Sequence, residues 1–307
     1  MKFSELVALL SDTGNRPYVL QGGKRGGKVV VAPSLVGRVM GSTIAGDRGR
    51  VLGWINPLAI EKGMIHPVFN DFGGAERFWF APEGGQFGLC MGRHIASPEH
   101  YHAPDGFNTQ PFKALTHDQS SVVMQSRMAF KNAGGTAFAV EVTRSVRVLD
   151  ACPYTLGFGK EIDFVGFQST NVTKNVGSKG IERATGAPAM FCISQFSSNN
   201  RLIIIIPVQP GPRGKLGPPI RWEYFEDYPI LKGGLPQKYW KVMKDVALFN
   251  VGEHGKIGVG RPRAVPRLAS IDLDSNELII VDCDFYPELE YAAGYWRRLE
   301  NPYDGDV

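Results

Sequence analysis

The chain has 307 residues, of which 43% are hydrophobic and 21% charged, and its formal net charge is +4. This length and composition predict a globular protein with one large domain or two ordinary ones. The mild charge and the lack of long Lys/Arg tracts argue against a nucleic-acid partner. The longest aliphatic run, residues 202–206, is ended by Pro207, so we expect no membrane-spanning segment.

The start of the chain predicts a short helix over residues 1–14. Apolar residues recur at helical spacing from Phe3 to Leu10, and Gly14 follows as a stop signal. Acidic residues within this segment and the lack of a small-residue cleavage site argue against a secretory signal peptide. We therefore expect a cytoplasmic protein, or an exported one from which a leader has been removed.

Signals for β-structure dominate the rest of the chain. The 37 glycines and 21 prolines are spread along it, which favours many turns between short strands. Connections of uneven length and the lack of a fixed repeat favour a large antiparallel β-sandwich over a propeller. We therefore predict an all-β protein in which residues 1–307 form a single domain, with the N-terminal helix packed on it.

The expected strands are residues 28–32, 38–41, 78–80, 86–91, 121–130, 138–149, 154–164, 166–173, 189–196, 202–208, 220–225, 247–251, 256–260, 267–273 and 277–285. Further helices are expected near residues 236–244 and 290–297.

Two stretches look like ligand-binding loops but are predicted to be hairpin turns. Residues 22–28 fit the first seven positions of a phosphate-binding loop, but Val29 stands where Ser or Thr is needed, and a strand follows in place of a helix. Residues 272–277 begin like a calcium loop, but Glu277 occupies the position that requires glycine.

Cysteine and histidine usage gives weaker signals. The four cysteines form no C-x-x-C pair, so we expect free thiols and a reducing compartment, with Cys90 and Cys192 among apolar neighbours. His94, His100 and His102 gather in one segment, and in an extended chain the last two would share a face and could bind a metal. Solvated loop histidines are the alternative, and we expect no metal and no other cofactor.

The most informative stretch is residues 71–88, DFGGAERFWFAPEGGQFG. It combines two glycine pairs, five large aromatic residues and several polar side chains, a mixture that neither a plain strand nor a plain loop requires. Aromatic rings can cover the C–H faces of a polyhydroxylated ligand while Arg, Glu and Gln bond its hydroxyls. The alternative is a glycine-rich hairpin whose aromatic residues belong to the core and whose charges are solvated.

This stretch resembles the hallmark of an uncharacterised bacterial family with a galactose-mutarotase-like β-supersandwich. Looser agreement extends over most of the chain, including Ser169–Asn171, Tyr224–Phe225 and the final segment Asn301–Val307. The residues that match the hallmark itself are Gly73, Gly74, Arg77, Phe78, Trp79, Pro82, Glu83, Gly84, Gly85 and Gln86.

The chain departs from that family pattern at two places. Ala75 stands where an acidic residue is expected, which leaves Glu76 as the only carboxylate there. The pattern also continues beyond the position of Val307, with at least one further strand. A chain without that strand would expose a sheet edge, and we expect a second copy of the chain to cover it in a homo-oligomer.

The resemblance implies a carbohydrate-handling protein, such as a sugar epimerase or mutarotase-like enzyme that moves protons in a concave aromatic groove. Glu83 or Glu76 would be the base and His66 the acid. Arg77 and Gln86 would bond sugar hydroxyls, and Trp79 would stack on a sugar face. The full set of expected substrate-binding residues is Arg77, Trp79, Gln86, Asn171 and Tyr224.

Other interpretations remain open. The same fold and aromatic residues would also suit a non-catalytic glycan-binding or assembly module. Glu83 would be structural if the amides of Gly84 and Gly85 held its carboxylate in a turn. The whole motif could also be scaffold, with the function in the loop of residues 93–118, which carries four histidines.

Overall fold

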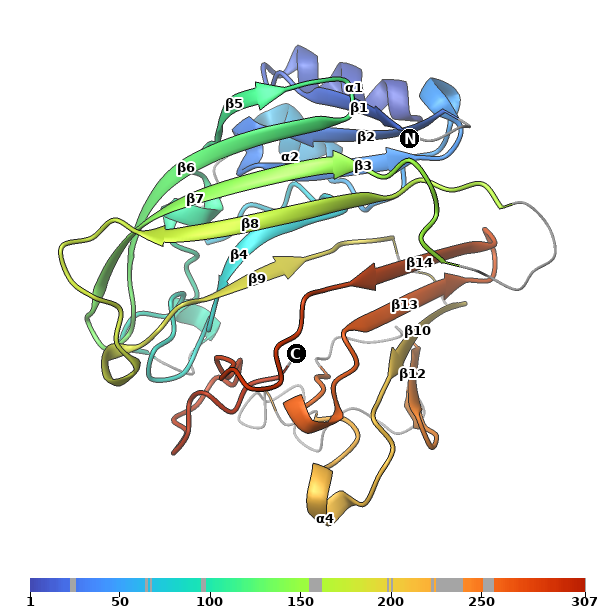
Figure 1. Cartoon of the computed structure of the whole chain (residues 1–307). Helices are drawn as coiled ribbons and strands as arrows, with labels where there is room; N and C mark the ends of the chain where they lie inside the picture. Colours follow the sequence, from blue (N-terminus) through green and yellow to red (C-terminus); the bar gives the residue numbers. More distant parts are fainter. Residues whose placement is uncertain are drawn as a thin grey trace. The chain divides into compact units, whose positions relative to one another are not determined.

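The computed structural model describes residues 1–22, 26–63, 66, 68–94, 98–154, 162–197, 199, 201–221, 224, 240–250 and 257–306. Within these residues, fourteen strands form four antiparallel sheets and the α-helices are short, which confirms the predicted all-β class (Figure 1). The chain divides into two compact units. Unit 1 comprises Met1–Phe80, Tyr101–Thr185 and Met190–Ser197, and unit 2 comprises Ala81–His100, Gly186–Ala189 and Ser198–Val307. A single domain over residues 1–307 stays a prediction.

The sheets have the strand orders β1-β2-β3, β4-β9, β5-β6-β7-β8 and β11-β12-β10-β13-β14. The strands are β1 (Tyr18–Gly22), β2 (Gly27–Ala32), β3 (Arg38–Thr43), β4 (Arg77–Ala81), β5 (Lys113–His117), β6 (Ser121–Lys131), β7 (Ala137–Val148), β8 (Phe167–Asn175), β9 (Ala189–Ile193), β10 (Leu202–Pro207), β11 (Trp240–Val242), β12 (Val246–Asn250), β13 (Arg267–Asp272) and β14 (Glu277–Asp282). The α-helices are α1 (Phe3–Asp12), α2 (Pro57–Lys62), α3 (Asp105–Asn108) and α4 (Arg213–Leu216).

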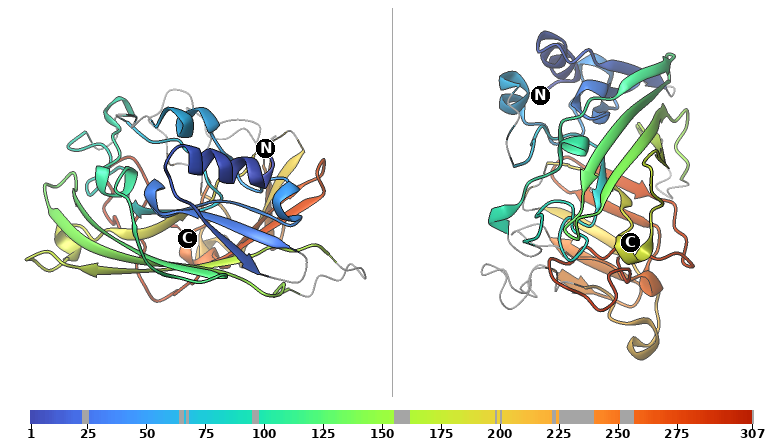
Figure 2. Two further views of the ribbon diagram at one scale, coloured as in Figure 1. Left: turned by 90° about the horizontal axis from the view of Figure 1, so that it is seen from above. Right: turned by 90° about the vertical axis from the view of Figure 1, so that its left-hand side faces the viewer.

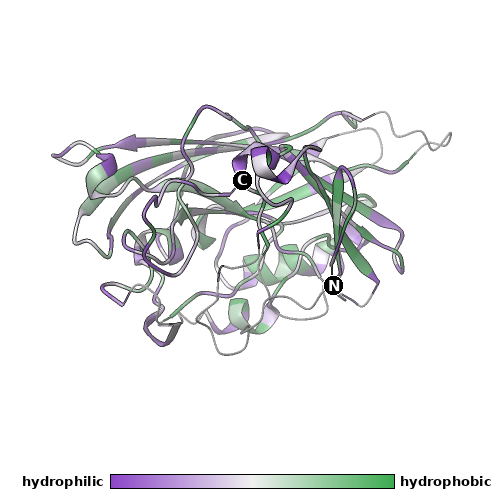
Figure 3. Ribbon diagram, turned by 90° about the horizontal axis from the view of Figure 1, so that it is seen from below, coloured by the Kyte–Doolittle hydropathy of each residue, from purple (hydrophilic) through white to green (hydrophobic). Residues whose placement is uncertain are grey.

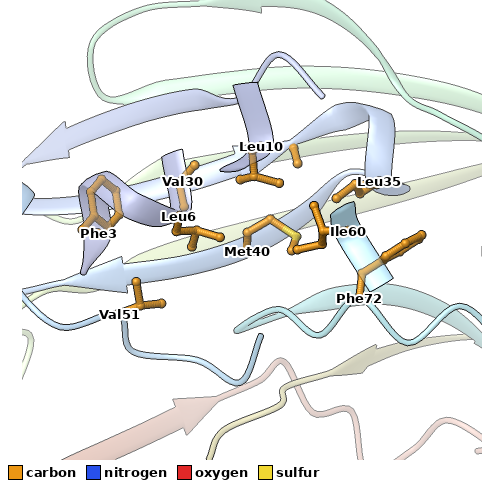
Figure 4. Packing of buried hydrophobic residues seen from close by; sticks show 10 residues of the cluster. Phe3, Leu6, Leu10, Val30, Leu35, Met40, Val51, Ile60 and Phe72 are labelled. Carbon is orange, nitrogen blue, oxygen red and sulfur yellow. The ribbon is translucent and has the colours of Figure 1, made fainter. Parts of the chain in front are cut away.

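Helix α1 confirms the expected N-terminal helix and covers the three-stranded sheet of unit 1 (Figure 2). Phe3, Leu6 and Leu10 are fully buried because their spacing places them on one face of the helix. They pack against Val30 and Met40 of the strands below, with further members of the cluster drawn in Figure 4. The helix thereby closes one face of a sheet whose central strand is buried on both sides.

The four-stranded sheet of unit 1 has one buried face, because side chains alternate along each strand. Buried positions alternate regularly along β6 and β7, and the strands carry both hydrophobic and hydrophilic segments (Figure 3). The hairpin between β6 and β7 pairs Met124 with Arg144, and β8 then pairs Asn171 with Arg144. This register places an arginine and an asparagine side by side in an otherwise apolar row.

Unit 2 contains the five-stranded sheet and a long C-terminal segment without regular structure. The predicted turn at residues 272–277 joins β13 to β14, and the Asp272 carboxylate accepts the amide of Asp274 at 2.9 Å. The other predicted turn lies between β1 and β2, which pair from Tyr18 to Gly22. Both hairpins are therefore confirmed.

Three expected elements are wrong in the described residues. Residues 86–91 form turns, because the amides of Gly88, Leu89 and Cys90 fold back onto the carbonyls of residues 82–85. Residues 240–242 of the expected second helix pair with β12 as strand β11. Residues 290–297 form no helix, since their amides bond to residues 302–303 of the following segment. The strands expected at residues 154–164 and 220–225 fall largely outside the described residues.

In the parts of the chain that the structure describes, no helix is long and apolar enough to cross a membrane. Strands β5 and β8 are the edges of the four-stranded sheet. Pairing of a sheet edge with a second copy of the chain stays a prediction.

Replacing Leu6 by Ala should lower the free energy of unfolding by about 2–5 kcal/mol, because it removes a fully buried side chain from the core under α1. Urea unfolding followed by circular dichroism would measure this loss. Leu58 lies on α2 and is 64% exposed, so Leu58→Ala is the matched control and should change stability by less than about 0.5 kcal/mol. Equal losses in the two variants would contradict this account of the core.

Candidate functional site

The segment from Glu76 through β4 sends its side chains alternately to two faces. Glu76 reaches Arg144 of β7, and Phe80 meets Phe130 of β6 with ring centroids 5.0 Å apart. Arg77 and Trp79 alternate with these residues, and Trp79 packs on Phe107, whose ring centroid also lies 5.9 Å from that of Phe80. Residues 76–80 of the expected sugar-binding motif therefore lie in two environments within unit 1, one on each face of the segment.

A buried ion pair between Glu76 and Arg144 lies at the centre of the first environment. Arg144 is fully buried, and its Nη2 donates to Oε2 of Glu76. Its Nε donates to the Gly37 carbonyl at 2.9 Å, and its Nη1 donates to Oδ1 of Asn171 at 2.6 Å. The guanidinium thus has a partner on each of its three nitrogens, which offsets the cost of removing the charge from water.

The backbone holds Glu76 in place for this pairing. Its amide and carbonyl exchange hydrogen bonds with Val39 of β3 at 3.1 and 2.9 Å. The chain reaches this position through Gly73, which has a φ of 79° and lies so close to the Trp54 carbonyl that a Cβ atom would collide with it. The first glycine pair of the motif therefore permits a close backbone approach that sets the position of Glu76.

Two buried oxygens on this face have no hydrogen-bond partner among the described residues. They are Oε1 of Glu76, a residue that is 5% exposed, and Oγ1 of Thr173. Thr173 lies two positions from Asn171 along β8, on the same face of the strand. A buried acceptor without a partner costs free energy, so a ligand that donates hydroxyl hydrogens would be favoured here.

Cys192 of β9 adjoins this polar group. The Asn171 side-chain amide donates to its sulfur at 3.5 Å. Burial of the sulfur raises the pKa of Cys192 most, the negative charge of Glu76 raises it further, and Arg144 lowers it in part, giving a pKa of about 12. The thiol is therefore protonated at neutral pH. The residue as a whole is exposed, so the expectation of a buried Cys192 is wrong, while Cys90 is buried as expected and all four cysteines are free.

The second environment encloses the other two motif residues. The Cζ atom of Arg77 lies over the rings of Phe69 and Trp79, at 4.5 and 4.3 Å from their centroids. Trp79 is fully buried and meets Phe107 with ring centroids 4.5 Å apart. Arg77 and Trp79 thus occupy the interior of unit 1.

Arg38 of β3 adds a further buried cation to this cluster. It is fully buried, and its guanidinium donates to the carbonyls of Gly73 and Asn70 at 2.7 and 3.1 Å. Burial lowers the pKa of Arg38 most, the neighbouring charge of Arg77 lowers it further, and Asp71 raises it in part, giving a pKa of about 9. Arg38 therefore keeps its charge at neutral pH and fixes the backbone that leads into the glycine pair.

His66, the expected acid, is exposed and takes part in a local turn. Its Nδ1 accepts the Val68 amide at 3.2 Å, and its own amide donates to the Asn70 side chain at 2.7 Å. In the described residues, no histidine and no second carboxylate hydrogen-bonds Glu76. The structure thus brings Glu76 and Asn171 together but does not add His66 to them.

Glu83, Gln86 and Tyr224 belong to unit 2. Glu83 is half-buried, and its carbonyl accepts the Cys90 amide at 2.9 Å. The Gln86 side chain makes two hydrogen bonds with the main chain of Leu299, at 2.7 and 3.0 Å. Gln86 thus fastens the turn of residues 82–89 to the C-terminal segment.

Tyr224 is 3% exposed and stacks on Tyr295 with ring centroids 4.5 Å apart. Gly258 makes room for this stack, since a Cβ atom there would collide with the Tyr224 hydroxyl. Arg221 lies next to it and forms ion pairs with Asp304 and with Asp306 at 3.1 Å. The ring of Tyr224 therefore forms part of the packing of unit 2.

The histidines of residues 94–102 form no metal centre in the described part of the chain. The rings of His94 and His100 stack 3.7 Å apart, nearly parallel at 9°, and His102 is exposed. No group of three potential metal ligands converges among the described residues.

Sequence reasoning missed Arg144 and Cys192. Arg144 could have been found, because it occupies an inward position between Val142 and Val146 in a strand that otherwise alternates regularly. A charge in an apolar row indicates a buried partner. Cys192 carried no comparable signal, since its neighbours in the sequence are apolar and only the fold brings it to Asn171.

The model of one protein family matches residues 1–307, and the chain therefore belongs to that family, which is described as a family of unknown function (DUF6786). No curated protein and no solved structure matches the chain.

Replacing Arg144 by Met should lower the free energy of unfolding by about 3–5 kcal/mol, because the Glu76 charge would stay buried without its cation. The double variant Arg144→Met with Glu76→Gln should recover most of this loss. Arg127 of β6 is exposed and pairs with Glu141 of β7, so Arg127→Met should cost about 1 kcal/mol or less. Denaturant titration measures all three, and similar losses for the two arginine variants would contradict a buried pair.

Replacing Glu76 by Gln should lower the pKa of Cys192, because it removes the negative charge that disfavours the thiolate and leaves the Arg144 cation that favours it. A larger thiolate fraction at a given pH should speed the alkylation of Cys192 by iodoacetamide several-fold at pH 8 to 9. Peptide mass spectrometry would follow Cys192 and Cys283 in the same sample. Cys283 should keep its rate, and an unchanged or slower Cys192 would contradict the assigned cause.

Proposed function

We propose that this protein binds carbohydrate on a galactose-mutarotase-like β-supersandwich, at the polar site formed by Glu76, Asn171 and Thr173 on the inner face of the four-stranded sheet. The observation that carries the proposal is the Glu76 carboxylate. Arg144 holds one of its oxygens, while the other is buried and has no hydrogen-bond partner in the described residues. A fixed acceptor of this kind suits a ligand rich in hydroxyl donors.

The neighbouring groups support the same class of ligand. The Asn171 amide lies beside Glu76, with its oxygen bonded to Arg144 and its nitrogen donating to Cys192, and the Thr173 hydroxyl is without a partner in the described residues. The exposed Met190 lies two residues from Cys192 on β9 and supplies apolar surface on the same face of that strand. Apolar surface beside polar tips matches the alternation of C–H and hydroxyl groups on a sugar.

The resemblance of residues 72–89 to a bacterial family with the mutarotase-like supersandwich supports the fold assignment. It carries less weight for the roles of individual residues. Arg77 and Trp79 are enclosed in unit 1, and Gln86 bonds to Leu299, so each of these side chains would have to leave its present partners to contact a sugar. The proposed site therefore keeps Glu76 and Asn171 from the expected set and adds Thr173.

A binding screen with monosaccharides and oligosaccharides tests the proposal on the wild type and on Glu76→Gln and Asn171→Ala. We expect the wild type to bind at least one sugar. Each variant should bind that sugar at least about tenfold more weakly, since each loses a hydrogen-bonding group worth about 1.4 kcal/mol or more. Thr170 adjoins Asn171 but faces outward on β8, so Thr170→Ala is the matched control and should bind as the wild type does.

Thermal unfolding of each variant would show that it is folded. If the wild type binds no sugar, the proposed function is wrong. If the wild type and all variants bind one sugar equally, only the location of the site is wrong.

A further inference from the structure

We propose that the buried arginines Arg38 and Arg77, together with the indole of Trp79, form a binding site for a small oxyanion in the interior of unit 1. The ligand would be a phosphate, a sulfate or a carboxylate. This inference goes beyond the proposed function and does not depend on it, because none of the three side chains belongs to the sugar site described above.

The first observation is a buried N–H group of Arg38 that lacks an acceptor. Two nitrogens of this fully buried guanidinium donate to main-chain carbonyls, but Nε has no hydrogen-bond partner in the described residues. Arg144 and Arg263 are also buried, and each of their guanidinium nitrogens has an acceptor. Arg38 therefore departs from the way in which this chain accommodates other buried arginines, and a buried donor without an acceptor costs free energy.

The second observation is the positive charge that gathers around Arg38. Arg77 is 4% exposed, and its charge adds to the effect of burial, which is the larger, in lowering the pKa of Arg38 to about 9. The charge of Asp71 raises this pKa in part, but Asp71 is exposed, and within the described ranges no carboxylate lies at ion-pair distance from Arg38. Because buried charges are normally paired, an oxyanion at this place would supply a countercharge.

The third observation is a second buried donor in the same cluster. Nε1 of the fully buried Trp79 has no hydrogen-bond partner among the residues that the structure describes. The Cζ atom of Arg77 lies 4.3 Å from the centroid of this indole, so the ring and the guanidinium are in contact. The two groups that lack acceptors, on Arg38 and on Trp79, are both N–H donors. An oxyanion accepts several hydrogen bonds at once, which a cation cannot do.

The surroundings of Arg38 suit a small ligand. No side chain occupies the position of Gly74 beside it, where a Cβ atom would lie 3.8 Å from both Cβ and Cδ of Arg38, and Cδ carries the Nε atom that lacks an acceptor. Val68 and Asp71 of the adjoining loop are exposed, and Phe69, which lies over the Arg77 guanidinium, is half-buried. The cluster therefore lies beneath a surface loop, which leaves a short path for a small ion.

Binding of inorganic phosphate to the full chain tests the proposal, with sulfate and acetate as further probes. The protein is kept in Tris chloride, and ions released from it on denaturation are identified by ion chromatography, so that an oxyanion carried through purification is also detected. Calorimetry measures the Kd, and thermal unfolding measures the Tm. We expect one oxyanion per chain and a Tm that rises with the logarithm of its concentration, beyond the effect of sodium chloride at the same ionic strength.

Single variants locate the binding. Arg38→Gln should weaken phosphate binding at least about tenfold, because it removes a charged donor. Trp79→Phe keeps an aromatic ring but removes the indole N–H, and it should weaken binding several-fold. Arg263→Gln is the matched control, since it removes a buried arginine whose nitrogens all have acceptors: it should lower the Tm but keep the wild-type Kd. Arg127→Gln removes an exposed charge and should also keep this Kd.

Three results would overturn the inference. The first is a wild type that releases no oxyanion on denaturation and binds none of the three probes. The second is binding that Trp79→Phe and a folded Arg38→Gln both retain, and the third is an equal loss of affinity in Arg127→Gln, which would indicate unspecific attraction to surface charge. If Arg38→Gln does not fold, the wild type and Trp79→Phe decide. None of these results involves a sugar, so this inference can fail while the proposed function stands.

Discussion

The ion pair between Glu76 and Arg144 is the constraint on which the rest of unit 1 depends. Burying these charges costs several kcal/mol per ion unless both are paired, so the strands that carry them must keep their register. Arg144 also binds the Gly37 carbonyl and the Asn171 side chain. One side chain thereby ties β7 to the start of β3, to the residue before β4 and to β8. A shift of one residue in the register of any of these segments would leave a buried charge without its partner.

Those parts of the fold could be predicted whose signals lie within one short segment of the sequence. Alternation along residues 121–130 and 138–149 revealed the longest hairpin, and helical spacing near the N-terminus revealed α1. The antiparallel pairing of β1 with β2 was also predicted correctly. The helix expected at residues 290–297 failed because its backbone groups bond to residues 302–303, a preference that no local pattern expresses. Long-range pairing overrode local propensity there.

The site was predictable only in part, for the same reason. Glu76 and Asn171 were both named from the sequence, but Arg144, which joins them, is 68 residues from Glu76 and 27 from Asn171. Arg77 and Trp79 were expected to bind a ligand. The sequence does not distinguish an exposed aromatic residue beside an arginine from a buried one. Only the packing of Phe69 against Arg77 and of Phe107 against Trp79 shows that these two side chains are buried.

The pair of hydrogen bonds between Gln86 and Leu299 affects how the chain folds while it is being synthesised. These residues are 213 positions apart, and residue 86 must wait for residue 299 to be synthesised. At about 5–20 residues per second this wait lasts roughly 10–40 seconds on the ribosome. Helix α1 and the strands β1 to β3 can pack in that time, while the turn of residues 82–89 still lacks its bonds to Leu299. Premature encounters of that turn are therefore a hazard that the nascent chain must survive before unit 2 can close.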